Sequence, residues 1–248
     1  MLAADLKMAL NPVLFARQSL GFEPDTWQQQ ALSWTGKRLL LNCCRQSGKS
    51  TTAAVIALHR ALYYPGSLIL LVSPSLRQSS ELFKKVADEF NKLEAKPKRL
   101  EDNRLSLILE SRSRIISLPS SEATIRGFSG ASLIIGDEAA RITDDLYYAV
   151  RPMLAVSGGK LILMSTPFGK RGFFFHEWTE GGQAWERIKI TCYDCPRIAP
   201  EFIKEEKAAM PDMFFKAEYE GEFTEAIDSV FSYELVMSAF SSEVKPLF

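Results

Sequence analysis

The stretch Leu39-Leu-Leu-Asn-Cys-Cys-Arg-Gln-Ser-Gly-Lys-Ser-Thr51 joins a short apolar run to a turn that contains glycine, and a helical pattern follows to about residue 63. A buried strand, such a turn and a helix together form a place where protein backbones bind phosphate groups. The strict pattern for such a loop has a glycine five residues before Gly48, where this chain has Cys43. A chance Gly-Lys-Ser at the start of a helix is the alternative interpretation.

The residue types in this turn suit the binding of a nucleotide together with a magnesium ion. Backbone N–H groups would surround the phosphates, Lys49 would reach the β and γ oxygens, and Ser50 would ligate Mg²⁺. Arg45 is unusual in such a loop, because it places a fixed cation beside the phosphates. The nucleotide-binding residues predicted in the loop are Arg45, Gln46, Ser47, Gly48, Lys49, Ser50 and Thr51.

A second motif ends another apolar run about 90 residues further along the chain, at Asp137 and Glu138. The Asp137 carboxylate at a strand end can hold the magnesium ion that Ser50 ligates, and the Glu138 carboxylate can polarise the attacking water. Ser165 and Thr166 close the next apolar run. Their small hydroxyls can sense the γ-phosphate and pass its loss to neighbouring segments, although a simple Ser/Thr-Pro turn is the alternative.

Short apolar runs alternate with longer amphipathic segments along most of the chain. The runs predicted to be buried strands cover residues 39–42, 68–73, 133–137 and 160–165. Helices are predicted at about 51–63 and at 76–93, a hairpin at 105–109 and 114–118, and one more strand at 186–192. Strands whose side chains are apolar on both faces, separated by helices, predict an α/β fold in which helices flank a central, mostly parallel sheet.

The character of the sequence changes after Phe168. Four glycines between residues 169 and 182 loosen the chain, and residues 200–234 hold ten acidic and three basic residues in a pattern that looks helical and solvated. We therefore predict a core over residues 1–183 and a small lid and linker over residues 184–248. Because the chain stops within apolar material at Phe248, we expect a truncation ahead of a further domain.

Composition limits the classes of protein that the chain can represent. It has 248 residues, 46% of them apolar, and 30 Lys and Arg balance 30 Asp and Glu. A protein that coats nucleic acid by bulk charge would be basic, so any contact with DNA must use a local cluster. Cys192 and Cys195 have ligand-like spacing but lack a second pair, which favours reduced thiols over a metal site. No signal sequence or membrane span is visible, so we expect a soluble intracellular protein.

Three motifs in this order resemble those of the large terminase subunits of tailed double-stranded DNA bacteriophages: Arg-Gln-Ser-Gly-Lys-Ser at 45–50, Ile-Gly-Asp-Glu-Ala at 135–139, and Ser-Thr-Pro at 165–167. Those proteins carry a P-loop (Walker A) without its first glycine and with an arginine four residues before the lysine, as Cys43 and Arg45 do here. Residues 215–223 resemble the stretch that closes terminase ATPase domains. The resemblance covers roughly residues 20–225 and implies a P-loop NTPase of the RecA/ASCE-like class.

The resemblance also implies roles for individual residues. Gln28 matches the glutamine that recognises adenine, although a helix capped at Asp25 explains the same segment. Arg126 corresponds to a finger that enters the neighbouring subunit's site, and Arg45 is the rival candidate for stabilising the transition state. A surface arginine paired with Glu122 is the alternative for Arg126. The predicted catalytic residues are Glu138, Lys49, Arg126 and Arg45, with Ser50 and Asp137 on magnesium and Ser165 and Thr166 in coupling.

The partners implied by the resemblance are ATP, Mg²⁺, double-stranded DNA, a portal protein, a small terminase subunit and further copies of the chain. The copies would form a ring on the portal in the host cytoplasm, without a membrane, and an isolated chain would be a weakly active monomer. A basic hairpin facing the pore would touch DNA phosphates without reading sequence. The candidate DNA-binding residues are Lys98, Arg99, Arg104, Arg112 and Arg114, with Lys96 nearby; such a charge cluster is more often just a solvated face.

Three functional hypotheses remain open from the sequence. The first is an ATP-hydrolysing motor that translocates double-stranded DNA into a procapsid. The second is a helicase-like DNA-remodelling ATPase, although no second lobe with arginine-rich helicase motifs is visible. The third is a nucleotide-binding assembly switch without turnover, which would not need a water-activating carboxylate at Glu138. We expect no nuclease activity, because an acidic cluster able to hold two metals is missing.

Overall fold

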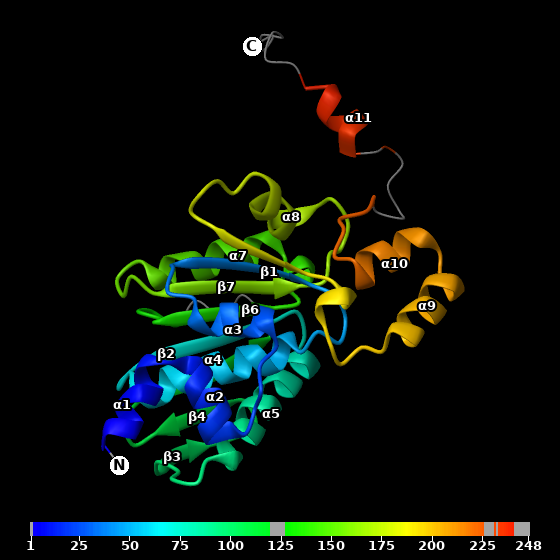
Figure 1. Ribbon diagram of the computed structural model, residues 1–248. Coiled ribbons are helices and arrows are strands. Elements are labelled where there is room, and N and C mark those ends of the chain that lie inside the picture. Colours follow the sequence, from blue (N-terminus) through cyan, green and yellow to red (C-terminus); the bar gives the residue numbers. More distant parts are fainter. Residues whose placement is uncertain (1, 120–126, 226–230, 232, 241–248) are drawn as a thin grey trace, which may run out of the picture.

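The computed structural model of the chain describes residues 2–119, 127–225, 231 and 233–240. Within these residues the structure has one eight-stranded sheet with the order β3-β4-β5-β2-β6-β7-β1-β8 (Figure 1). The strands are β1 (Arg38–Cys43), β2 (Leu68–Ser73), β3 (Arg99–Asp102), β4 (Ser106–Leu109), β5 (Arg114–Pro119), β6 (Leu133–Asp137), β7 (Lys160–Ser165) and β8 (Glu186–Ile190). The predicted buried strands are confirmed, three of them with the predicted bounds.

Helices cover both faces of this sheet. The helices of the described residues are α1 (Leu2–Leu10), α2 (Pro12–Leu20), α3 (Thr26–Ser33), α4 (Lys49–Tyr63), α5 (Leu76–Lys92), α7 (Asp144–Val150), α8 (Gly172–Thr179), α9 (Pro200–Ala209), α10 (Asp212–Tyr219) and α11 (Tyr233–Ser238), of which α9, α10 and α11 lie away from the faces of the sheet (Figure 1). Single 3₁₀ turns span Ala139–Arg141, Arg151–Leu154 and Cys192–Asp194. In the part of the chain that the structure describes, no helix is both long and apolar enough to cross a membrane.

Six neighbouring strands, from β5 to β8, run parallel, and the four inner ones, β2, β6, β7 and β1, are buried along almost their whole length. Along β1, Leu39 and Leu41 pack into a core with α2 to α5, whereas Leu40 packs into a second core with α7 and α8. Successive side chains of a strand point to opposite faces, so each buried strand supplies both cores. The result is the predicted three-layered α/β fold of a P-loop NTPase.

The predicted hairpin lies near one edge of the sheet. β4 pairs antiparallel with β5, so that Ser106 lies opposite Ile116 and Ile108 lies opposite Arg114. A further strand that the sequence did not predict, β3, pairs antiparallel with β4. Its residues are mostly exposed, and an exposed edge strand lacks the apolar alternation by which strands are recognised.

The glycines after Phe168 do not loosen the chain as predicted, because helix α8 begins among them. Gly172 has a φ of 73°, a left-handed backbone conformation that few other residues adopt. The next three residues, Phe173 to Phe175, are buried, and the Phe173 ring stacks on Tyr147 with 4.1 Å between ring centroids. Burial of this aromatic cluster stabilises the helix despite its glycine neighbours.

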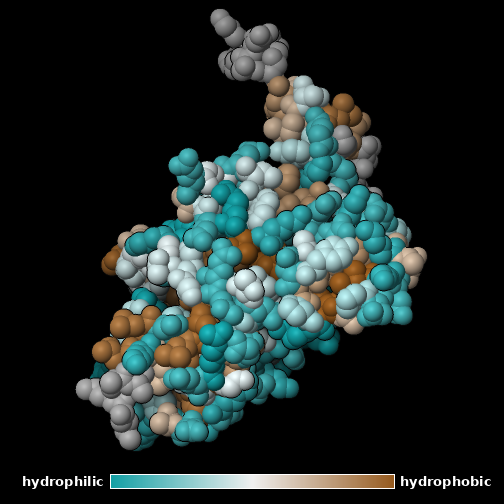
Figure 2. Space-filling model, in the orientation of Figure 1, coloured by the Kyte–Doolittle hydropathy of each residue, from teal (hydrophilic) through white to brown (hydrophobic). Residues whose placement is uncertain are grey.

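Strand β8 extends the sheet past the predicted end of the core at residue 183, because it pairs in parallel with β1. The two helices that follow, α9 and α10, form a small unit beyond one end of the sheet (Figure 1). Ile203 of α9 and Phe215 of α10 are buried in the same core as α4. Around these helices and around α1, apolar residues reach a surface that is otherwise mostly hydrophilic (Figure 2); they include Leu6, Leu10, Phe202 and Phe214.

Candidate functional site

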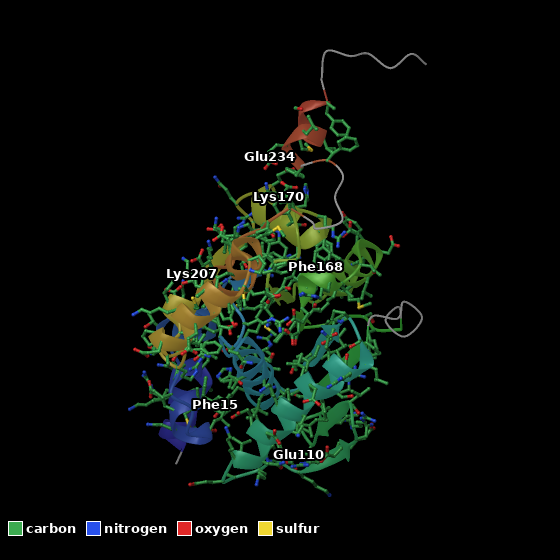
Figure 3. All side chains as sticks on the ribbon, turned by 90° about the vertical axis from the view of Figure 1, so that its right-hand side faces the viewer. Phe15, Glu110, Phe168, Lys170, Lys207 and Glu234 are labelled. Atoms are coloured by element: carbon green, nitrogen blue, oxygen red, sulfur yellow. The ribbon has the colours of Figure 1, made fainter. Side chains whose placement is uncertain are left out.

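The predicted phosphate loop lies between the carboxyl end of β1 and the start of α4, at the edge of the sheet that Figure 3 faces. A cavity of about 370 Å³ opens there. Carboxyl ends of parallel strands meet at one edge, so the ends of β6 and β7 lie beside the loop. The cavity is lined by Arg45, Gln46, Ser47, Gly48, Lys49, Ser50, Thr51, Gln78, Lys85, Glu138, Arg141 and Thr166.

The loop backbone takes conformations that fit a tight turn around an anion. Gly48 has a φ of 91°, and a Cβ atom there would lie 2.8 Å from Nε2 of Gln28 and 3.0 Å from the Arg197 guanidinium. Gln46 also has a positive φ, of 59°, which costs a non-glycine residue free energy and is typical of functional sites. The loop is therefore held in a defined shape before any ligand binds.

Cys43 occupies the position of the first glycine without distorting the loop. It is the last residue of β1, pairs with Ile190 of β8, and is fully buried in the core. Its backbone is still part of a strand, so the conformational freedom of glycine is not needed there. Burial raises the pKa of its thiol to about 12, and a neutral side chain is what this packing requires.

Lys49 and Glu138 form an ion pair across the cavity, with 2.9 Å between Nζ and Oε1. Burial alone would lower the pKa of Lys49, but the charges of Glu138 and Asp137 outweigh it and the pKa is raised. Glu138 has a φ of 51°, in the left-handed region. This strained backbone turns the side chain back from the end of β6 towards the loop, and such strain is often found at functional sites.

Asp137 and Ser50 offer two neighbouring oxygens for a metal ion. The Ser50 hydroxyl lies 3.4 Å from Oδ2 of Asp137. Burial raises the pKa of Asp137 to about 6, against the opposing attraction of Lys49. A buried carboxylate beside a hydroxyl is a donor set that suits Mg²⁺, which prefers oxygen ligands and few protein groups.

The end of β7 contributes to the site through one of its two predicted hydroxyls. Thr166 lines the cavity, and its Oγ1 accepts a hydrogen bond of 3.4 Å from Nη1 of Arg141. The Ser165 hydroxyl is buried and lies outside the cavity lining, without a hydrogen-bond partner in the described residues. A role for Ser165 and Thr166 in coupling stays a prediction.

Arg45 joins the loop to helix α10. Its Nε lies 2.5 Å from Oε2 of Glu218, and its backbone N–H donates to the Glu218 carbonyl at 2.8 Å. In addition, Nδ2 of Asn42 donates to the carbonyl of Gly221, just after α10. The predicted lid thus contacts the phosphate loop directly, and the Arg45 side chain, which is 61% exposed, points to the lid.

Gln28 lies beneath the loop rather than in the lining of the cavity. Its Oε1 accepts from the backbone N–H of Asp25, which begins α3 as predicted. Its buried Nε2 has no partner among the described residues. Arg197 completes this cluster by pairing with Asp25 at 2.8 Å and donating to the Ser47 carbonyl at 2.8 Å. Contact of Gln28 with adenine stays a prediction.

The candidate DNA-binding residues lie on the β3–β4–β5 edge, away from the cavity. Lys98, Arg104, Arg112 and Arg114 are exposed. Arg99 is paired with Asp102 and lies over the Phe90 ring, so its charge is already partly satisfied. Arg126, the predicted finger, falls outside the described residues, and its role stays a prediction.

The four cysteines are all buried and free of disulfides. The sulfurs of Cys44 and Cys195 lie 3.7 Å apart, where the phosphate loop meets the segment after β8. Among the described residues, no group of three or more His, Cys, Asp or Glu side chains has a geometry that could hold a metal ion.

Four residues of the site were not predicted from the sequence. Gln78 and Lys85 come from α5, Arg141 from the 3₁₀ turn after β6, and Arg197 from the segment after β8. The position of Arg141, three residues after Glu138, was a usable signal, because such spacing places two side chains on one side of a helical turn. The other three lack a fixed spacing to any motif.

Comparison with known proteins identifies relatives of this arrangement. The family model described as "Terminase large subunit, T4likevirus-type, N-terminal" matches residues 40–237. The large terminase subunit of Thermus virus P23-45 is 29% identical over an alignment of 248 positions. This alignment covers 86% of this chain and 51% of that protein. The subunit of Thermus phage G20c matches to the same extent. The chain therefore spans about half the length of the curated relatives it matches.

Solved structures share the fold at lower sequence identity. The ATPase domain of the Thermus phage P74-26 large terminase has a TM-score of 0.74 and 24% identity, covering 85% of this chain and 97% of that one. The large terminase of bacteriophage HK97 has a TM-score of 0.71 and 15% identity over 87% of this chain and 55% of its own. The large terminase of a thermophilic bacteriophage, in complex with ADP, has a TM-score of 0.67 and 11% identity, covering 81% of this chain and 53% of its own.

Proposed function

The chain belongs to the family of terminase large subunits, and from this premise we propose that it is an ATP-hydrolysing motor that translocates double-stranded DNA into a viral procapsid. One observation carries the proposal. Lys49 and Glu138 pair at 2.9 Å in a cavity that Ser50 also lines, and the Ser50 hydroxyl lies 3.4 Å from the buried Asp137 carboxylate. A phosphate-binding lysine, a metal-binding pair and a carboxylate for water activation are the parts that ATP hydrolysis requires.

Each of these residues has a defined task in the proposed reaction. The loop N–H groups and Lys49 bind the phosphates and hold the γ-phosphoryl group in line with the attacking water. Ser50 and Asp137 would hold Mg²⁺, which neutralises charge on the phosphate oxygens. Glu138 orients the water and accepts its proton. Because Lys49 must turn towards the phosphates, the arriving nucleotide breaks the ion pair that holds Glu138 in its absence.

The alternative functions make different demands on this site. A nucleotide-dependent assembly switch would need the loop and Lys49 but not a carboxylate that activates water. A helicase-like remodeller would use the same residues and differ in what it moves. The strained backbone of Glu138, which directs its carboxylate into the cavity, favours an enzyme over a switch.

The proposed partners follow from membership of the family. We propose that copies of the chain assemble as a ring on a portal protein in the host cytoplasm, together with a small terminase subunit. The exposed cations Lys98, Arg104, Arg112 and Arg114, with Arg99, are the proposed contacts to DNA phosphates. Contacts of this kind carry no sequence information, as packaging a whole genome requires.

The test is ATP turnover by the chain and by Glu138→Gln, which removes the charge and keeps the shape. We expect Glu138→Gln to bind ATP and to lose at least ~100-fold in turnover, the lower end of what a general base contributes. Glu23→Gln, in an exposed pair far from the cavity, is the matched control and should keep full activity. ATP binding without Glu138-dependent turnover, with DNA and portal present, would leave the switch as the better account.

A further inference from the structure

Glu138 is held by two cations, of which Lys49 is only one. Nη1 of Arg141 lies 3.3 Å from Oε2 of Glu138, while Lys49 binds the other oxygen. Both side chains of the Arg141 pair are partly buried. Arg141 ends the 3₁₀ turn that begins directly after Glu138, so its guanidinium reaches back over the carboxylate.

The same guanidinium also contacts the end of the neighbouring strand. Nη1 of Arg141 donates to Oγ1 of Thr166 at 3.4 Å, and its Cζ lies 4.5 Å from the centre of the Phe168 ring. Phe168 lies in the segment after β7, to the right of Lys207 of α9 in the view of Figure 3. β6 and β7 are hydrogen-bonded neighbours, so Arg141 bridges the ends of two adjacent strands across the cavity.

Nucleotide binding leaves Arg141 as the cation on Glu138. The triphosphate draws Lys49 away from the carboxylate, because a P-loop lysine binds the β and γ oxygens. Of the other cations lining the cavity, Arg45 is paired with Glu218, and Lys85 lies on α5. Nη1 of Arg141 reaches both Glu138 and Thr166, while the flat guanidinium lies over the Phe168 ring, a stacking contact that the ammonium of a lysine does not reproduce.

We propose that Arg141 is a positioning residue that keeps Glu138 aimed at the attacking water and links this orientation to Thr166 at the end of β7. A change in the position of Thr166 then moves the carboxylate through a single side chain. The inference rests on the proposed ATPase function. It assigns to Arg141 a role that differs from those of Arg45 and Arg126, because Arg141 acts on Glu138 and not on the phosphates.

A purely structural role is the simpler alternative, and it makes a different prediction. A partly exposed ion pair between residues three apart contributes little to folding free energy. Arg141→Gln should therefore fold with a melting temperature close to that of the wild type. If the residue only stabilised the turn, turnover would change no more than stability does.

The experiment compares kcat, affinity for a slowly hydrolysed ATP analogue and melting temperature in Arg141→Gln, Arg141→Lys and the control Arg17→Gln. We expect Arg141→Gln to lose at least ~10-fold in kcat while its affinity changes less than ~3-fold, since an orienting group acts on the transition state. Arg141→Lys keeps the charge but loses the flat guanidinium that lies over the Phe168 ring, and it should recover little. Arg17, in an exposed pair with Glu23, should be replaceable without effect.

A double-mutant cycle tests the link to Thr166. Thr166→Val removes the acceptor, and we expect it to lower kcat in the wild type but to have little further effect in Arg141→Gln. Non-additivity of this kind identifies residues that act through one contact. Additive effects would overturn the proposed link between the two strand ends.

The outcomes separate this inference from the proposed function. If Glu138→Gln abolishes turnover but Arg141→Gln keeps the wild-type kcat, the ATPase stands and the role of Arg141 is refuted. An equal loss of affinity and kcat in Arg141→Gln would make the residue a phosphate ligand, which also refutes it. If the wild type shows no Glu138-dependent turnover, both proposals fail together.

Discussion

The phosphate loop has no room for a side chain at the position of Gly48. Its φ of 91° is one cost for any other residue, and the nearness of Gln28 and Arg197 is a second. Gly48→Ala should therefore fold with a displaced loop and bind ATP at least ~10-fold more weakly, because the loop N–H groups no longer converge on the phosphates. Calorimetric titration with ATP measures this.

Gly66 is the matched control for that substitution. Its φ is 72°, but nothing lies within 4 Å of the position where a Cβ would be added. Gly66→Ala should lose about 1–2 kcal/mol of stability from the left-handed backbone alone and keep its ATP affinity. Equal ATP binding by Gly48→Ala and the wild type would mean that the loop can shift without loss.

Burial of the Asp137 carboxylate, a proposed magnesium ligand, lowers the stability of the protein at neutral pH. Its pKa is raised to about 6, so its charged form is disfavoured in the folded state. An acid whose pKa is higher when folded than when unfolded costs stability above the folded value, and the cost disappears as the pH falls towards the unfolded value. A shift from 3.8 to about 6 corresponds to about 3 kcal/mol at neutral pH.

We therefore expect Asp137→Asn to be more stable than the wild type at pH 8 in EDTA, by up to about 3 kcal/mol. The difference should shrink as the pH falls from 7 to 5, because the wild-type carboxyl becomes neutral. Magnesium-dependent turnover should be lost. Urea unfolding at a series of pH values checks this, with Asp212→Asn, in an exposed pair with Lys216, as control. A pH-independent difference would locate the effect elsewhere.

The residues named by the motifs could be found from the sequence, whereas those brought in by packing could not. The loop residues 45–51, Glu138 and Thr166 line one cavity, as their order along the chain indicated. Lys85 and Arg197 reach the site from segments 36 residues after and 148 residues after Lys49. Only the crossing of helices and strands in three dimensions brings such side chains together.

Whether a strand or helix could be predicted from the sequence depended on how deeply it is buried. Strands that are apolar on both faces were located almost to the residue, since their runs stand out from any surface segment. The exposed strand β3 has no apolar run of this kind. Helix α8 has buried apolar residues, but the glycines at both of its ends obscured it. Strand β8 was predicted, but its place beside β1 depends on long-range pairing that no local pattern encodes.

Helix α10 holds the lid against the phosphate loop through one buried ring. Phe215 is fully buried, whereas its neighbour Phe214 is 42% exposed. Phe215→Ala should cost about 3–5 kcal/mol and loosen α10, because its other links to the loop region are polar: the half-exposed pair of Arg45 and Glu218, the backbone hydrogen bond between these two residues, and the hydrogen bond from Asn42 to Gly221. Hydrogen exchange of residues 212–219 should accelerate strongly while β1 and β7 stay protected.

Phe214→Ala serves as the control on the same helix, and we expect it to leave the exchange of α10 nearly unchanged. If Phe215→Ala accelerates exchange throughout the sheet as well, the lid and the core unfold as one unit. The lid would then be a fixed part of the domain and could not move with the nucleotide.

The molecule as a whole has no net charge, but its charges are distributed unevenly. Equal numbers of cations and anions leave no general attraction for DNA, and the cations of the site are largely engaged: Lys49 with Glu138, and Arg45 with Glu218. The predicted lid is acidic, since residues 200–234 hold ten acidic and three basic residues. Within the described residues, the site therefore has few free cations of its own to stabilise the charge that develops during phosphoryl transfer.

A cation supplied by a second copy would remedy this shortage, and Arg126 is the predicted source. Because association of two copies is bimolecular, turnover per molecule should then rise with protein concentration, and Arg126→Ala should remove the rise. A mixture of Arg126→Ala and Glu138→Ala, each inactive alone, should regain part of the activity. In the mixture, the intact Glu138 of one copy meets the intact Arg126 of its neighbour. Turnover that is strictly proportional to concentration, and unchanged in Arg126→Ala, would instead assign transition-state stabilisation to Arg45 within its own chain.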